Sequence, residues 1–145
     1  MLQRFPLYTA AQVRQLDRHA IEQAGIPGYI LMSRAGESAW LRLRKHWPAA
    51  RSLLVLCGTG NNGGDGYVIG RLALEAGHAV LVMQLGDAAG IRGDALAARE
   101  AAAFHGKLER LEPGSGNELN GVRRMLALAQ RFNFNVEEYE ERIPV

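Results

Sequence analysis

A glycine-rich stretch, GTGNNGGDG at Gly58–Gly66, is the part of this chain best suited to bind a ligand. Glycine lets a backbone turn sharply and approach a ligand without a Cβ in the way. Asn61, Asn62 and Asp65 place three polar side chains directly after a continuous apolar run, Leu53–Cys57. Because open α/β sheets bind nucleotides at the carboxyl ends of their strands, this position predicts a nucleotide site.

Three of the glycines match the dinucleotide pattern GxGxxG, but two features argue against a Rossmann oxidoreductase. The pattern requires an acid near the end of the second strand to hold a ribose, and here Asp87 comes late. Asp65 lies where we expect the next helix to begin. A carboxylate there could cap helix N–H groups and occupy the place of a pyrophosphate.

Residue chemistry leaves several uses of the stretch open. Amide oxygens, backbone carbonyls and a carboxylate suit a ribose hydroxyl, a carboxamide or a metal cation. Alternatively, Asn61, Asn62 and the glycines only build a left-handed turn, and Asp65 only caps the helix. The P-loop pattern GxxxxGK[ST] has no match, which argues against a P-loop nucleotidase.

Two helices are expected before the first strand. Thr9–Gln12 has the form of a capping box and predicts a first helix that Gly25 ends. A second helix is predicted from Tyr29 to Trp47, with Pro48 as its stop. Its inward stripe is expected to contain Met32, Ala35, Ala39, Leu43 and Trp47.

Strands and helices alternate after that point. Strands are predicted at Ser52–Cys57, His78–Leu85 and Lys107–Leu111, with helices from Tyr67 to Ala76 and Asp94–His105 between them. This order predicts an α/β fold with a parallel sheet and right-handed crossovers. A loop at 112–117 and a helix at Glu118–Phe132 are predicted beyond it.

Length and composition limit the class of protein to which this chain can belong. The chain has 145 residues, 48% of them hydrophobic and 22% charged, which is typical of one soluble globular domain. A net charge of only +2 predicts no nucleic-acid partner, although residues 1–52 carry eight Arg or Lys against three Asp or Glu, taken here as a solvated face. No apolar run reaches the roughly 18 residues of a membrane span. The single cysteine, Cys57, is expected to be a buried small hydrophobe in a reducing, cytoplasmic setting.

GTGNNGGDG after Val55–Cys57, with Leu31–Gly36 upstream and Gly93-Asp94-Ala95 downstream, closely resembles the NAD(P)H-hydrate epimerase family over about residues 7–111. The resemblance implies a Rossmann-like three-layer fold with a parallel sheet, preceded by two N-terminal helices. It also implies interconversion of the R and S forms of hydrated NADH and NADPH (NADHX and NADPHX). By the same resemblance, the hydrated nucleotide is bound by Asn61, Asn62, Gly63, Gly64 and Asp65, and a potassium ion (K+) is bound by Asn62.

The resemblance further implies a homodimer and a functional partner, an ADP- or ATP-dependent NAD(P)H-hydrate dehydratase that is often fused in bacteria. The later family segments, including the acidic residue at the reacting ring, find no counterpart after Leu111. We therefore expect one partial domain at 1–145, with an incomplete sheet and with 112–145 diverging from the family. The catalytic acid–base residue is unassigned, and weak or absent epimerase activity is expected of this chain alone. The alternative hypothesis is a non-catalytic nucleotide-binding or interaction module that keeps the glycine-rich stretch.

Overall fold

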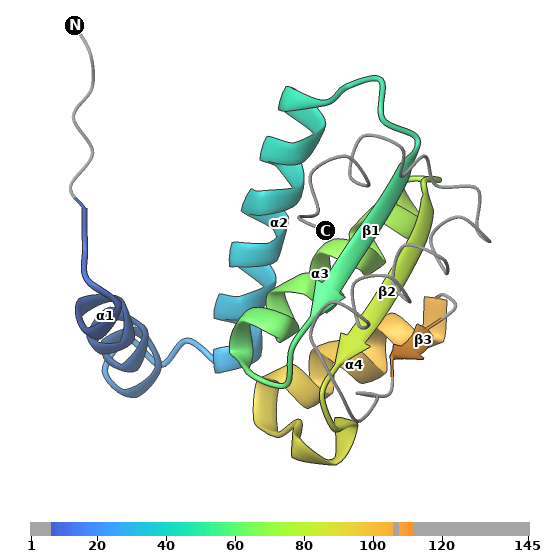
Figure 1. Cartoon of the computed structure of the whole chain (residues 1–145). Coiled ribbons are helices and arrows are strands. Elements are labelled where there is room, and N and C mark those ends of the chain that lie inside the picture. The colour runs from blue at the N-terminus through green and yellow to red at the C-terminus, as the bar shows by residue number, and fades with distance from the viewer. Residues whose placement is uncertain (1–6, 106–107, 112–145) are drawn as a thin grey trace, which may run out of the picture.

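The structure, a computed structural model, describes residues 7–105 and 108–111 (Figure 1). Its elements, in chain order, are α1 (Ala10–Glu22), α2 (Gly28–His46), β1 (Ser52–Cys57), α3 (Asn61–Glu75), β2 (Ala79–Leu85), the short 3-10 turn η1 (Ala88–Gly90), α4 (Gly93–His105) and β3 (Leu108–Leu111). The α/β class, the two preceding helices and all three predicted strands are confirmed. The loop predicted at 112–117 and the helix predicted at Glu118–Phe132 lie outside the described residues.

The three strands form one parallel sheet in the order β1-β2-β3. Leu54 of β1 pairs with Leu81 of β2, and Val82 pairs with Leu108 of β3. Helix α3 connects β1 to β2 and packs on both strands, and α4 packs along α3 (Figure 1). Two layers of the expected three-layer sandwich are therefore seen in the described residues.

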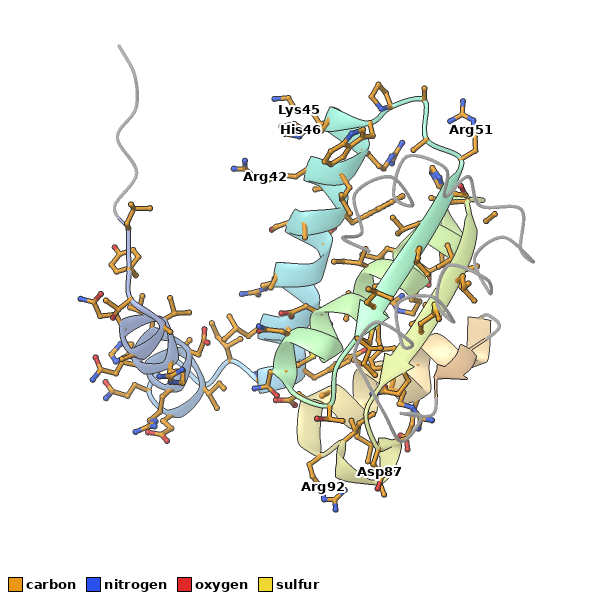
Figure 2. All side chains as sticks on the ribbon, in the orientation of Figure 1. Arg42, Lys45, His46, Arg51, Asp87 and Arg92 are labelled. Atoms are coloured by element: carbon orange, nitrogen blue, oxygen red, sulfur yellow. The ribbon has the colours of Figure 1, made fainter. Side chains whose placement is uncertain are left out.

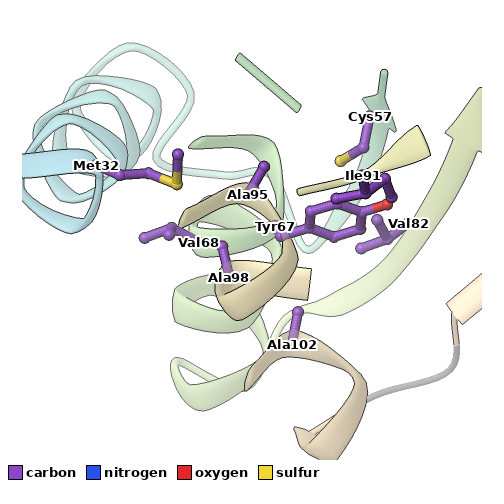
Figure 3. Close-up of a cluster of buried hydrophobic side chains, with 9 residues drawn as sticks. All are labelled: Met32, Cys57, Tyr67, Val68, Val82, Ile91, Ala95, Ala98 and Ala102. Carbon is purple, nitrogen blue, oxygen red and sulfur yellow. The ribbon is translucent and has the colours of Figure 1, made fainter. Parts of the chain in front are cut away.

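A compact apolar cluster joins α2, α3, α4 and the sheet (Figure 3). Its buried members are Met32, Cys57, Tyr67, Val68, Val82, Ile91, Ala95, Ala98 and Ala102. Cys57 is 0% exposed, which confirms its prediction as a buried small residue. Burial raises the pKa of its thiol to about 12, so a thiolate nucleophile is excluded at neutral pH.

Helix α3 lies unusually close to the sheet because glycines face it. A Cβ placed on Gly66 would lie 2.7 Å from Cys57 Sγ, and one placed on Gly70 would lie 2.8 Å from Val82 Cγ2. Neither distance leaves room for a methyl group. The helix backbone itself therefore packs on the strands.

The buried face of α2 differs from the predicted stripe. Its buried residues are Met32, Gly36 and Trp40, whereas Ala35 is exposed and Trp47 is 62% exposed. A Cβ on Gly36 would lie 2.6 Å from Val68 Cγ1, so α2 packs closely on α3 at a glycine. The buried row then follows the i, i+4 spacing from that contact rather than the most apolar positions.

Helix α1 forms as predicted but stands apart from the rest (Figure 1). Its capping box is present: Thr9 N–H donates to Gln12 Oε1 at 2.8 Å, and Gln12 N–H donates to Thr9 Oγ1 at 3.3 Å. No α1 residue is buried, and Leu16 is 53% exposed. None of the helices in the described part of the chain has the length and apolarity to cross a membrane.

The tight packing of α3 on the sheet gives a stability prediction. Gly70→Ala should lower the free energy of unfolding by about 1–2 kcal/mol, because overpacking against the stiff Val82 side chain outweighs the gain in helix propensity. Gly60→Ala is the matched control, since no atom lies within 4 Å of its Cβ position, and its loss should stay below about 1 kcal/mol. Urea unfolding of both variants measures the difference, and equal effects would contradict this account of the packing.

Candidate functional site

The segment NNGGDG forms the first turns of α3 rather than a loop. Helix α3 begins at Asn61, six residues before the predicted start at Tyr67, and Gly60 is its N-cap with φ −93°. No glycine between Gly58 and Gly66 has a positive φ, so the left-handed-turn hypothesis is wrong. Glycine is a poor helix former, and the glycine-rich sequence therefore did not predict these first turns of α3.

Gly63 and Gly64 are packing residues. A Cβ on Gly63 would collide with the backbone of Gly58, and one on Gly64 would lie 2.5 Å from Met32 Sδ and 3.1 Å from Ala95 Cα. The space that a side chain would fill at Gly63 and Gly64 is thus occupied by other parts of this protein, and it is not available to a ligand. By contrast, nothing lies within 4 Å of the Cβ positions of Gly58 and Gly60. The open side of the segment is therefore its start.

The start of α3 presents unused hydrogen-bond donors. The N–H groups of Gly63 and Gly64 both donate to Gly60 O, at 2.9 and 3.2 Å. The backbone N–H groups of Asn61 and Asn62 have no acceptor among the described residues, and both side chains are exposed. Free N–H groups at the positive end of a helix dipole form an anion site.

Two further helices begin at the same edge of the sheet, where β1 and β2 end (Figure 1). Gly64 of α3 lies against Met32 of α2 and Ala95 of α4. At the start of α2, a Cβ on Gly28 would collide with the carboxylate of Asp94, in the first turn of α4. The positive ends of α2, α3 and α4 therefore converge. The Asp94 carboxylate already lies at the starts of α2 and α4, whereas the first turn of α3 has no acidic residue and stays available for a negatively charged group.

Asp65 lies in the second turn of α3, and the first turn contains no acidic residue. It therefore does not cap the helix or occupy the place of a pyrophosphate, and both expectations are wrong. Its side chain is half-buried, and burial, followed by repulsion from Asp17 of α1, raises the pKa of its carboxyl group. Because Asp65 follows Asn62 by three residues, the two side chains share one helix face.

This face is where the predicted potassium ion can be tested against the structure. Asn62 offers an exposed amide oxygen, and the carboxylate of Asp65 lies one turn further along the helix. Both are hard-oxygen groups, and hard cations such as Ca²⁺ take about six to eight of them. The donor chemistry fits a cation, but the part of the chain that the structure describes contains no group of three or more His, Cys, Asp or Glu able to hold a metal.

A second segment, Gly86–Arg92, borders the start of α3 and was not assigned to the site from sequence. A Cβ on Gly86 would lie 3.3 Å from Thr59 Cγ2, and one on Gly90 would lie 3.9 Å from it. Gly86 has φ +86°, which turns the chain at the end of β2. The glycine and the following Asp87 were the available signals for this turn.

Several basic residues near the end of α2 lie far from this edge. Figure 2 shows Arg42, Lys45, His46 and Arg51 at the opposite end of α2 from Asp87 and Arg92. All four are exposed, as expected of a solvated face.

The raised pKa of Asp65 gives a pH-dependent prediction. Ionisation of Asp65 costs folding free energy, so the wild-type chain loses stability as pH rises through the raised folded-state pKa. Asp65→Asn should therefore be more stable than wild type at pH 7, with a gain that vanishes below the ordinary Asp pKa of 3.8. Asp17→Asn should give a smaller gain in stability, since repulsion from Asp17 is the lesser of the two causes that raise the pKa of Asp65.

Urea unfolding between pH 3 and pH 8 in potassium-free buffer measures these differences. Glu37→Gln, at an exposed position of α2, is the control for removal of one negative charge and should give no comparable gain. An Asp65→Asn variant that is less stable than wild type at pH 7 would show that the ionised carboxylate is stabilised by a partner.

Comparison with known proteins identifies the family to which this chain is similar. The model of the family described as YjeF-related protein N-terminus matches residues 28–120, starting and ending later than the expected 7–111. A bifunctional NAD(P)H-hydrate repair enzyme of Coxiella burnetii is 47% identical over 66% of this chain and 19% of its own length. An NAD(P)H-hydrate epimerase of Limosilactobacillus fermentum is 44% identical over 56% of this chain and 39% of its own length. The chain thus spans less than half of each of these relatives.

A solved structure shares the fold. The crystal structure of yeast ynu0 matches 81% of this chain and 51% of its own chain with a TM-score of 0.64, at 23% sequence identity. This likeness supports a Rossmann-like α/β arrangement for the described elements. With the family match covering more than half of its residues, the chain belongs to the YjeF-related protein N-terminus family.

Proposed function

We propose that this chain acts in nicotinamide-nucleotide repair, in the epimerisation of the R and S forms of NADHX and NADPHX. The proposal is supported by relatives that are named as NAD(P)H-hydrate epimerases and repair enzymes. The structural observation that carries it is the start of α3, where Asn61 and Asn62 present unused backbone N–H groups at the converging positive ends of three helices. A dinucleotide carries a pyrophosphate that such a site attracts.

Each residue of the segment has a distinct task in this proposal. The backbone N–H groups of Asn61 and Asn62 donate to phosphate oxygens, and their exposed amides hydrogen-bond to the rest of the nucleotide. Gly63 and Gly64 allow α3 to start close to Gly58 and Ala95, and so they act through packing. Asp65 accepts hydrogen bonds from the ligand on the Asn62 face.

The proposal includes a potassium ion bound at the helix face that Asn62 and Asp65 share, because both side chains offer oxygen ligands. The amide oxygen of Asn62 is the proposed ligand, and a bound cation would offset negative charge of the substrate and of Asp65. The remaining ligands are not assigned.

Epimerisation at ring carbon 6 requires an acid–base group within reach of that carbon. Asp65 is proposed as a binding residue, and no catalytic residue is assigned. We therefore expect only a small rate increase from this chain alone. The wider proposal includes a cytoplasmic location, a homodimer and an NAD(P)H-hydrate dehydratase as functional partner, and it includes neither nucleic acid nor a membrane.

A coupled assay tests this function. Mixed NADHX epimers are supplied with an S-specific dehydratase and potassium, and loss of the R form is followed with and without the chain. The chain should raise the rate above the protein-free value. Asn62→Ala should weaken substrate binding about tenfold or more, by loss of about 1.4 kcal/mol of hydrogen bonding.

Arg42→Ala is the control, because its side chain lies at the far end of α2 (Figure 2). Saturable NADHX binding without any rate increase would favour the alternative, a non-catalytic nucleotide-binding module. Neither binding nor a rate increase would contradict both functions.

A further inference from the structure

The sheet has a second apolar face, opposite to the one that α3 covers. A Cβ on Gly70 of α3 would lie 2.8 Å from Val82 Cγ2, 3.8 Å from Val80 Cγ1 and 4.0 Å from Val55 Cγ2, so these three valines point toward α3. Because successive side chains of a strand point to opposite faces, their neighbours in β1 and β2 point away from α3. We call this second side the outer face; its large apolar residues are Leu54, Leu56, Leu81, Met83 and Leu85.

The middle of the outer face is buried. Leu81 is 1% exposed and Met83 is 0% exposed, yet neither belongs to the apolar cluster that α2, α3 and α4 form with the sheet. Within residues 7–105 and 108–111, α3 is the helix that packs on β1 and β2, and it lies on the opposite face (Figure 1). Parallel sheets are found almost only with both faces covered. The outer face therefore needs a covering segment from elsewhere in the chain.

One stretch outside the described ranges has the length and the pattern for this task. Residues 1–6 and 106–107 are too short to form a covering helix, whereas residues 112–145 are not. Within them, the predicted helix at 118–132 would be about 22 Å long, close to the roughly 23 Å of the seven-residue strand β2. Its apolar residues recur at spacings of three and four and so share one helix face: Leu119, Val122, Leu126 and Ala129.

The connection from β3 allows this helix to reach the outer face. Strand β3 ends at Leu111, and residues 112–117 can span about 20 Å, more than the roughly 10 Å between packed layers. The crossovers through α3 and α4 step in one direction, from β1 to β2 to β3, and right-handedness places both helices on the same face. A right-handed return from β3 toward β1 crosses the other face.

We propose that residues 118–132 form a helix that covers the outer face, with its apolar side against Leu81 and Met83. The polar residues Asn120, Arg124 and Arg131 lie on the other side of this helix and would face solvent. Residues 121–145 lie beyond the part of the chain that the family model matches. The chain would thus close its sheet, and complete a third layer, with a segment of its own.

Photo-cross-linking of the whole chain tests where the segment lies. Leu56 is 46% exposed and pairs with Met83 in the sheet register, so the variant Leu56→benzoylphenylalanine should cross-link to peptides within residues 118–132 of the same chain. Leu41→benzoylphenylalanine, at a 56% exposed position of α2, is the control and should not cross-link to that segment. A mixture of unlabelled and ¹⁵N-labelled chains separates cross-links within one chain from those between two. Absence of the cross-link from position 56, or its formation only between chains, would overturn the proposal.

Thermal unfolding of two matched variants tests which side of the helix is buried. Leu126 and Leu128 lie roughly 200° apart around a helix, so only Leu126 is expected to face the sheet. Leu126→Asp should lower the melting temperature by at least about 5 °C, whereas Leu128→Asp should lower it by less than about 2 °C. Equal shifts for the two variants would overturn the proposal. If Leu126→Asp does not fold, the cross-link from position 56 in the otherwise unchanged chain still decides.

Discussion

Helix α3 packs with its backbone directly against the sheet and the neighbouring helices, and the position of the candidate site follows from this packing. Gly66 and Gly70 bring its backbone against β1 and β2, while Gly63 and Gly64 bring its first turns against Gly58 and the neighbouring helices. A side chain at any of these positions would push the helix outward. Because α3 is held so close, only three residues separate the end of β1 from the start of α3, and the unused N–H groups of α3 lie at the edge of the sheet.

The same constraint explains the electrostatics of the site. Three helices start together at this edge, and the start of α3, which has no acidic residue in its first turn, favours a negatively charged ligand. Asp65 lies one turn further along α3, half-buried and close enough to Asp17 for repulsion to raise its pKa. Ionisation of a half-buried carboxyl group lowers the free energy of unfolding. Groups with such shifted pKa values are concentrated at functional sites of proteins. The arrangement suits a ligand that combines phosphates with hydroxyl or amide groups.

Much of the fold could be predicted from sequence because it depends on local patterns. Apolar runs predict the strands, and the capping box predicts the start of α1. The early start of α3 could not be predicted, since its glycines disfavour an isolated helix and only tertiary packing makes them suitable. The buried face of α2 depends likewise on the contact between Gly36 and Val68. Asn61 and Asn62 could be proposed as site residues from their chemistry alone, whereas the position of Gly86–Arg92 beside the start of α3 depends on a contact with Thr59 that no local pattern reveals.

The start of α3 is the proposed nucleotide-binding site. The most direct test is a ¹⁵N-resolved NMR titration of the whole chain with NADHX in potassium buffer. Nucleotide bound at the start of α3 should shift the backbone amide signals of Asn61 and Asn62 progressively and saturably, while those of Arg42 and Lys45 at the far end of α2 should stay in place. Saturable shifts that leave Asn61 and Asn62 unchanged would contradict it.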